Sequence, residues 1–195
     1  MTVVNALEAK NLFKVFGRNP KNAVSRLKAG QSRADVVDAG TAAVIDASFT
    51  VQRGEIFVIM GLSGSGKSTI IRMLNGLLEP TAGEVIVQGQ NVTKASAAEL
   101  RAIRRASVSM VFQHFALLRR AAEILEKVGL GDRADAFPDE LSGGMRQRVG
   151  LARALTAGTD ILLMDEAFSA LDPLIRREMQ EQLIELQQEL GRTII

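Results

Sequence analysis

Residues 61–69 constrain the fold of this chain more than any other stretch. They read Gly-Leu-Ser-Gly-Ser-Gly-Lys-Ser-Thr and match the phosphate-loop pattern G-x-x-x-x-G-K-S/T in full. The apolar run at 56–60 predicts a fully buried strand before the loop, and a helix is predicted over 67–77 after it. The pattern requires this order of strand, loop and helix, because loop amides and the helix N-terminus then face one anion.

This loop predicts a site for the phosphates of a nucleotide. Its glycines let the backbone wrap a phosphate with the N–H groups pointing inward. We expect Lys67 to contact the β- and γ-phosphates as a catalytic charge, and the Ser68 hydroxyl to ligate Mg²⁺. A glycine-rich turn with a chance lysine is the competing interpretation. The residues of this loop expected to bind ATP are Gly61, Ser63, Gly64, Ser65, Gly66, Lys67, Ser68 and Thr69.

Two adjacent carboxylates predict the other half of the site. Asp165 and Glu166 directly follow the apolar run 161–164, which reads as a strand. Ligands of α/β sheets bind at the carboxyl ends of the strands, so we expect Asp165 to hold Mg²⁺ there. Glu166 is the candidate catalytic base, polarising a water for in-line attack on the γ-phosphate. These elements alone indicate a phosphate-loop NTPase, a class that includes kinases, GTPases, motors and helicases.

The remaining pattern predicts an α/β fold with a largely parallel sheet. Ser96 with Glu99 forms a capping box, and Asp172 followed by Pro173 begins a helix. Residues 18–40 are polar and basic, so we expect a solvated surface insertion with one short helix rather than a binding patch. Further strands are expected over 7–17, 43–51, 84–87, 108–112 and 192–195, and further helices over 96–105, 119–128, 142–157 and 172–190.

Composition narrows where and with what the protein works. The net charge is +2 over 195 residues, which does not require nucleic acid as a partner. There is no cysteine, which excludes disulfides, thiolate metal sites and a cysteine nucleophile. No apolar run approaches the roughly 18 residues that span a bilayer, and no signal peptide opens the chain. We therefore expect a cytoplasmic protein that another polypeptide would hold at any membrane.

Residues 141–148, Leu-Ser-Gly-Gly-Met-Arg-Gln-Arg, resemble the signature motif of ATP-binding cassette (ABC) ATPases. Ser142, Gly143 and Gly144 open a helix and create a second anion-binding end, which makes sense if it completes a neighbour's site. An ordinary serine-capped helix is the competing interpretation. The other motifs of the family follow in order, which favours the resemblance.

The resemblance implies roles for further residues. Gln113 resembles the glutamine that reaches Mg²⁺ and senses the membrane partner. Residues 169–172, which end at Asp172, resemble the loop that crosses the dimer interface. Phe16 stands where the family has an aromatic that stacks on adenine, although Phe13 and Phe16 are also candidate core residues.

The resemblance also implies an architecture and partners. It implies one ABC nucleotide-binding domain over 1–195 with a RecA-like phosphate-loop core, a largely parallel sheet and an antiparallel β subdomain. The core would comprise about 1–115 and 149–195, and a small, shortened helical subdomain about 116–148. Two such subunits would sandwich ATP and Mg²⁺ head to tail beneath transmembrane permease subunits, at the cytoplasmic face of the membrane. A substrate-binding protein would be an indirect partner, and nucleic acid would not be one.

The residues that make up these motifs resemble those of one branch of the family, the ATPase subunits of glycine betaine and proline betaine importers. The ATPase subunit never touches the solute, so an ABC ATPase for a different solute stays an alternative.

Two features depart from the family: the chain stops before the switch histidine, and Leu118 runs straight into Arg119 where a longer stretch is usual. His114, the only histidine, reads as a loop residue. A hydrolysis-deficient nucleotide-binding module is therefore a second alternative; a soluble ABC protein of DNA repair or translation and a small-molecule kinase are rivals.

Overall fold

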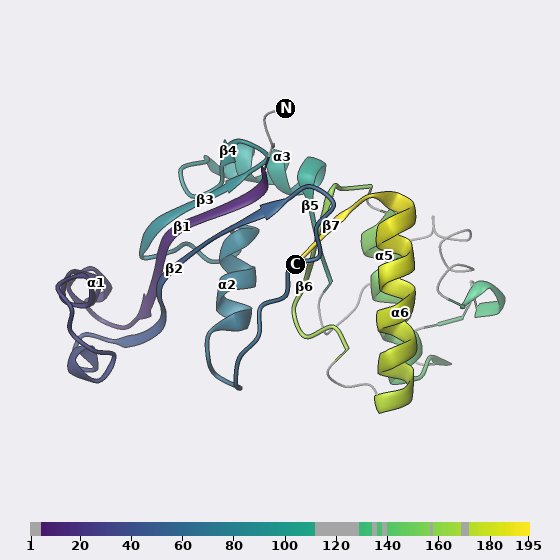
Figure 1. The fold of residues 1–195 in the computed structure, drawn as a ribbon, viewed down its shortest axis with the longest axis horizontal. Helices are drawn as coiled ribbons and strands as arrows, with labels where there is room; N and C mark the ends of the chain where they lie inside the picture. The colour runs from purple at the N-terminus through teal and green to yellow at the C-terminus, as the bar shows by residue number, and fades with distance from the viewer. Residues whose placement is uncertain (1–4, 112–128, 134–135, 138–139, 157, 169–171) are drawn as a thin grey trace. The chain divides into compact units, whose positions relative to one another are not determined.

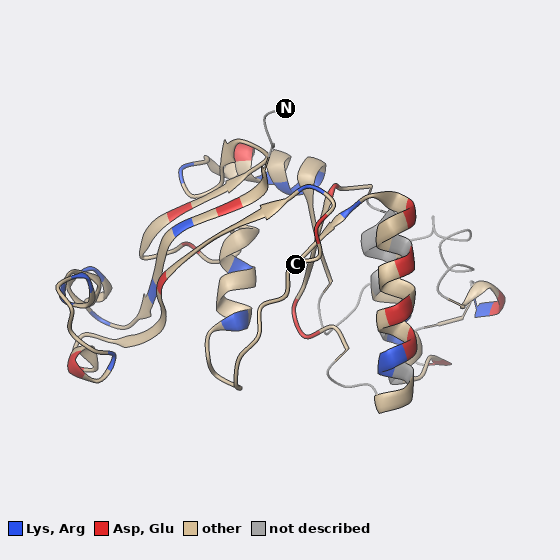
Figure 2. Ribbon diagram, viewed as in Figure 1, with Lys and Arg blue, Asp and Glu red and all other residues tan. Residues whose placement is uncertain are grey.

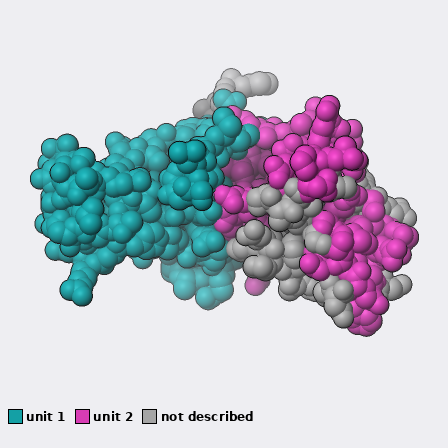
Figure 3. Space-filling model, turned by 90° about the horizontal axis from the view of Figure 1, so that it is seen from below, with its two compact units in different colours: residues 1–53, 57–104 teal, residues 54–56, 105–195 magenta. Residues whose placement is uncertain are grey.

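The computed structural model describes residues 5–111, 129–133, 136–137, 140–156, 158–168 and 172–195 (Figure 1). The chain divides into two compact units (Figure 3). Unit 1 comprises residues 1–53 and 57–104, and unit 2 comprises residues 54–56 and 105–195. Unit 1 holds an antiparallel sheet and unit 2 a parallel one, so the predicted α/β combination of both sheet types is confirmed.

Four antiparallel strands form the sheet of unit 1, in the order β2-β1-β3-β4. They are β1 (Asn5–Phe16), β2 (Thr41–Gln52), β3 (Ala82–Val87) and β4 (Gln90–Asn91). Helix α2 (Lys67–Leu74) follows β2 in the chain, and α3 (Ala97–Ser107) follows β4. Apolar side chains on the strands and on α2 make the core of this unit, and those without any exposed surface are Leu7, Leu12, Val51, Met73, Leu74, Val85 and Val87.

The polar insertion after β1 is a packed structure, so the prediction of a solvated segment is wrong in part. It contains the expected short helix, α1 (Pro20–Lys28), and also a 3-10 turn, η1 (Ala34–Val36). The apolar residues of α1 recur at helical spacing and meet β1 and β2 in a closed cluster. The burial was hidden in the sequence because polar and charged residues outnumber the apolar ones in this insertion. The cluster consists of Phe13, Val15, Ala23, Val24, Leu27, Val36, Ala39 and Ala42.

Three parallel strands form the sheet of unit 2, in the order β5-β6-β7. They are β5 (Val108–Val111), β6 (Ile161–Met164) and β7 (Thr193–Ile194). The first three residues of β6 are buried, as expected for a central parallel strand with partners on both edges. Helices α5 (Gly143–Thr156) and α6 (Pro173–Leu190) and the 3-10 turn η2 (Gly131–Arg133) complete the described part of the unit.

Helix α6 has one acidic face that is exposed to solvent and one apolar face that is buried. Glu178, Glu181, Glu185 and Glu189 recur every three or four residues and are all exposed. Figure 2 shows these acidic residues in red along the helix. Met179 and Leu183, on the opposite face, are buried in the core of unit 2.

The predicted buried strand at 56–60 is wrong. Only Ile56 makes a bridge, parallel to Ile194, where the Ile194 amide donates to Glu55 at 2.9 Å. Phe57 instead stacks on Phe49 of β2 with ring centroids 5.0 Å apart. Val58 is 66% exposed and Met60 86% exposed. An apolar run becomes a buried strand only if neighbouring strands pair with it, and the described ladder ends at Ile56.

The predicted helix starts are confirmed. The Ser96 amide donates to Glu99 at 2.8 Å, and the Glu99 amide donates to the Ser96 hydroxyl at 3.3 Å, which is a reciprocal capping box. Ser96 thereby lowers the pKa of Glu99. The helix predicted over 119–128 lies outside the described residues.

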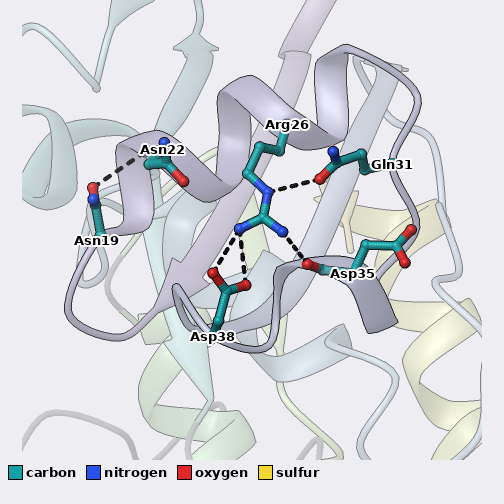
Figure 4. Close-up of polar contacts among 6 residues, drawn as sticks. All are labelled: Asn19, Asn22, Arg26, Gln31, Asp35 and Asp38. Carbon is teal, nitrogen blue, oxygen red and sulfur yellow. Dashed lines mark hydrogen bonds and ion pairs between the residues drawn. The ribbon is translucent and has the colours of Figure 1, made fainter.

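Arg26 links helix α1 to the segment around η1 (Figure 4). Its guanidinium donates to both carboxylate oxygens of Asp38 at 2.8 Å, to Gln31 at 2.7 Å and to the Asp35 carbonyl. These hydrogen bonds hold the pKa of Asp38 below its ordinary value. The pair therefore stabilises the fold above the ordinary range of an aspartate, and this contribution is lost as pH falls through the lowered pKa.

We expect Arg26→Ala to loosen the contact between α1 and η1 without unfolding unit 1, because the apolar cluster beneath it stays intact. The amides of residues 34–40 should exchange with solvent up to about 5-fold faster, the upper end for an exposed ion pair. Hydrogen exchange measured by mass spectrometry checks this, with the exposed Arg33→Ala as the matched control. Equal exchange in the two variants would contradict a structural role for Arg26.

Candidate nucleotide site

The phosphate loop lies in unit 1 and ends at α2. Gly66 precedes the helix with a left-handed φ of 97°, and its carbonyl accepts from the Ile70 amide at 2.9 Å. A Cβ at Gly66 would collide with the Ala43 carbonyl oxygen of β2. Gly64 also has a left-handed φ, of 76°, and the Ser65 amide closes a turn onto Leu62 at 3.1 Å. Only glycine fits at position 66, because the backbone there is both left-handed and in contact with β2.

Lys67 folds back over this loop. Its ammonium donates to the Gly61 carbonyl at 3.1 Å and to the Leu62 carbonyl at 3.0 Å. Ser68 and Thr69 follow in the first turn of α2 and are half-buried. Ser63 and Gly64 form the exposed tip of the loop. A cation, a helix N-terminus and a glycine-rich backbone therefore converge at one place, which suits an anion such as a phosphate.

Phe16 lies on the same unit, at the end of β1. It pairs with Thr41 of β2, two residues before Ala43, which touches Gly66. Two strand residues span about 7 Å. The Phe16 side chain is 45% exposed, whereas Phe13 is buried in the insertion's cluster. Of these two candidate core residues, Phe13 therefore belongs to the core and Phe16 to the surface.

Lys14 is a neighbour of Phe16 that the sequence patterns did not single out. Its Nζ lies 5.1 Å from the centroid of the Phe16 ring. The alternation of a strand places residues i and i+2 on one face, which is the signal in the sequence that points to Lys14.

The acidic pair lies in unit 2, at the carboxyl end of β6 as predicted. Asp165 is half-buried and Glu166 is exposed. Glu166 has a left-handed φ of 51°. A non-glycine residue in this conformation carries strain, and such residues gather at functional sites. Asn11, Asp46 and Gln88 have the same left-handed backbone, so the position of Glu166 at the end of β6 is what makes it a candidate.

The second predicted anion-binding end is also formed in unit 2. The Ser142 hydroxyl accepts from the Met145 amide at 3.2 Å, and Gly143 and Gly144 make the first turn of α5. The buried Leu141 anchors this start, since its carbonyl accepts from Arg146 at 2.6 Å. Ser142 itself is exposed. A helix N-terminus with small residues and open access suits an anion brought by another molecule.

Asp172 caps α6, where its carboxylate accepts from the Leu174 amide at 3.1 Å. Gln113 and His114, and residues 169–171 of the loop predicted to cross a dimer interface, lie outside the described residues. The structure thus brings Phe16 and the phosphate loop together in unit 1. Unit 2 holds Asp165, Glu166, Asp172 and the Ser142 turn.

The donors expected for Mg²⁺ fit its chemistry. Within the described ranges there is no group of three or more His, Cys, Asp or Glu that forms an all-protein metal cage. Mg²⁺ does not need one, since it is usually held by one or two carboxylates together with waters and substrate phosphates. Ser68 in unit 1 and Asp165 in unit 2 each carry a hard oxygen of the kind that Mg²⁺ prefers.

Comparison with known proteins decides the family. A profile of the ABC transporter family matches residues 44–169. The chain belongs to the ABC transporter family. This range contains the phosphate loop, the Ser142 turn and the acidic pair, so the resemblance drawn from these motifs is confirmed.

The curated relatives include ATP-binding proteins of betaine transport systems. The chain is 50% identical to the glycine betaine/proline betaine transport ATP-binding protein ProV of Salmonella typhimurium, covering 97% of this chain and 54% of ProV. It is 48% identical to the glycine betaine transport ATP-binding protein OpuAA of Bacillus subtilis, covering 97% of this chain and 51% of OpuAA. The chain therefore spans about half the length of these relatives.

Two further observations concern the length and the fold. The alignment with ProV runs over 215 positions against the 195 residues here, so at least 20 positions have no counterpart in this chain. The dimeric ATP-binding cassette MJ0796, in a post-hydrolysis state bound to ADP and Pi, superposes with a TM-score of 0.77 at 28% identity. That match covers 96% of this chain and 85% of MJ0796. None of the helices in the part of the chain that the structure describes is long and apolar enough to cross a membrane.

We expect Gly66→Ala to destabilise the protein by about 3 kcal/mol. About 1–2 kcal/mol comes from the left-handed backbone, and the rest from overlap with Ala43. Denaturant unfolding measures this. Gly30→Ala is the matched control, because Gly30 has a φ of 91° with nothing within 4 Å of its Cβ position. An equal loss in both variants would show that the contact with β2 does not matter.

Proposed function

We propose that this chain is the ATP-binding and ATP-hydrolysing part of an ABC importer for glycine betaine, proline betaine or a related osmoprotectant. The observation that carries the proposal is the 50% identity to ProV over 97% of the chain, with the phosphate loop, the Ser142 turn and the acidic pair all formed. The domain would be one ABC nucleotide-binding domain, with its core at about 1–115 and 149–195 and its helical subdomain at about 116–148.

The loop geometry supports a division of labour in binding. The backbone of residues 61–66 and the N-terminus of α2 would hold the β-phosphate, and Lys67 would exchange its two loop carbonyls for the β- and γ-phosphate oxygens. The two hydrogen bonds keep the ammonium beside the loop, where a bound phosphate would meet it. The exposed ring of Phe16 would stack on the base.

Hydrolysis would depend on oxygens from several elements. Ser68, Asp165 and Gln113 would hold Mg²⁺, which would neutralise charge on the phosphates when bound. Glu166 would polarise the attacking water. Its exposed position at the carboxyl end of β6 supports this role, since a base must face the substrate.

A second copy of the chain would complete the site. Ser142, Gly143 and Gly144 of one subunit would bind the γ-phosphate held by the other, with Asp172 near the interface. One relative of similar fold, the ATP-binding cassette MJ0796, is described as dimeric in two separate structures. ATP has the γ-phosphate that ADP lacks, so the closed pair would favour ATP, and hydrolysis would open it.

The solute is proposed from the names of the relatives. These transport ATP-binding proteins are named for glycine betaine, proline betaine and carnitine, and a relative from Ruegeria pomeroyi at 45% identity is named for trimethylamine N-oxide. A relative named for methionine import matches at 43% identity over less of the chain, 81%. Permease subunits would hold the chain at the cytoplasmic face of the membrane, and a substrate-binding protein would deliver the solute.

We expect Glu166→Gln to bind ATP with unchanged affinity and to hydrolyse it at least about 10²-fold more slowly, because the general base is removed. Phosphate release and equilibrium ATP binding measure the two effects. Glu185→Gln, on the exposed face of α6, is the control with the same change of charge. Unchanged turnover would remove Glu166 from the role of base. ATP binding by the unaltered protein without any hydrolysis would favour the hydrolysis-deficient alternative.

We expect Ser142→Glu to abolish ATP-dependent dimerisation of the Glu166→Gln protein while the monomer still binds ATP. The new carboxylate at the start of α5 would repel the γ-phosphate of the partner's nucleotide. Light scattering coupled to size exclusion measures the mass with and without ATP. Gln180→Glu, an exposed position on α6, is the matched control and should leave the dimer intact. Dimers that survive Ser142→Glu would contradict the head-to-tail arrangement.

A further inference from the structure

Lys14 lies against the face of Phe16 and is itself held in place. The two side chains lie on one face of β1, while Phe13 and Val15 lie buried on the other. The Lys14 ammonium is 5.1 Å from the ring centroid of Phe16, and it donates to the Glu79 carbonyl at 2.6 Å. The carbonyl fixes the cation, and the cation covers one face of the ring.

The backbone around Phe16 is fixed on both sides. Before it, the Val15 amide donates to the Thr81 hydroxyl at 3.1 Å, and the Thr81 amide donates to the Phe13 carbonyl at 2.7 Å. After it, Gly17 crosses Gly40 so closely that a Cβ at Gly17 would lie 2.5 Å from the Gly40 Cα. The segment that carries Glu79 and Thr81 therefore sets both the strand and the lysine.

We propose that Lys14 is a positioning residue for the nucleotide base: its ammonium covers one face of Phe16 and leaves the exposed face for stacking with adenine. This inference rests on the proposed function, in which Phe16 binds the base. A cation attracts the π electrons of a ring towards itself, so the opposite face becomes less negative and stacks better on an electron-rich purine. The cation also limits the base to one side of the ring.

The position of Phe16 relative to the phosphate loop supports the same assignment. Phe16 pairs with Thr41, and Ala43 of the same strand touches Gly66 of the loop. The base platform and the phosphate loop thus share β2 as their support. A fixed ring orientation matters in this arrangement, because the phosphates and the base belong to one ligand and must be bound together.

The test compares ATP with inorganic tripolyphosphate, which carries the phosphates without the base. We expect Lys14→Met to weaken ATP binding by about 2- to 5-fold, the range for an exposed cation–π contact, and to leave tripolyphosphate binding unchanged. Lys14→Arg, which keeps the charge, should restore ATP binding. Lys10→Met is the control, since Lys10 lies on the same strand and pairs with Glu8 at 2.7 Å.

A double-mutant cycle with Phe16→Ala separates positioning from general structure. If Lys14 acts through the ring, Lys14→Met should have no further effect on the ratio of ATP to tripolyphosphate affinity once Phe16 is removed. Should Lys14→Met fail to fold, as judged by circular dichroism, Lys14→Gln is measured in the same cycle. Phe16→Trp adds a direct signal, because the chain has no other tryptophan or tyrosine and a stacked base quenches the introduced indole.

The outcomes distinguish this inference from the proposed function. Binding of neither ATP nor tripolyphosphate by the unaltered protein would overturn the proposed function itself. Equal affinities for the two would overturn the role of Phe16, and that of Lys14 with it. Tighter binding of ATP with no coupling between Lys14 and Phe16, or an equal loss of both ligands in Lys14→Met, would overturn the role of Lys14 alone.

Discussion

The contact between Gly66 and the Ala43 carbonyl is the constraint on which the candidate site in unit 1 depends. The loop backbone can meet β2 there only because Gly66 has no Cβ and adopts a left-handed φ. This contact sets where α2 begins, and α2 in turn sets the direction of its N-terminal amides. The same strand carries Thr41, the partner of Phe16. One glycine therefore ties the phosphate loop to the strand pair that holds the aromatic ring.

The two units contribute different chemistry. Unit 1 offers a cation, amides and an aromatic ring, which suit the binding of a nucleotide's phosphates and base. Unit 2 offers a carboxylate pair and a second helix start, which suit metal binding, water activation and contact with a further anion. The first set of groups suits nucleotide binding alone, and the second set supplies the groups that the proposed hydrolysis needs. Membership of the ABC transporter family accounts for both sets in one chain.

Features set by neighbours in the sequence were predictable. The capping box of Ser96 and Glu99, the cap at Asp172 and the start of α5 at Ser142 each depend on hydrogen bonds within three residues. The strand β6 was also predicted, since four apolar residues end at an acidic pair.

Features set by partners distant in the sequence were not predictable. Residues 56–60 are as apolar as β6, yet β6 has strands on both edges, whereas Ile56 makes a single bridge. The packing of α1 escaped prediction because only Ala23, Val24 and Leu27 form its apolar face, which is too short to indicate burial. The contact between Lys14 and Glu79 was not predictable because the two residues lie 65 positions apart.

The most direct measurement of the central claim is ATP hydrolysis by the chain assembled in lipid vesicles with the permease subunits and the substrate-binding protein of the proposed importer. Phosphate release is followed with glycine betaine, with methionine and without solute. If the chain powers a betaine importer, glycine betaine will stimulate hydrolysis and methionine will not. Hydrolysis that responds to methionine alone, or that responds to neither solute, would contradict the proposed solute class.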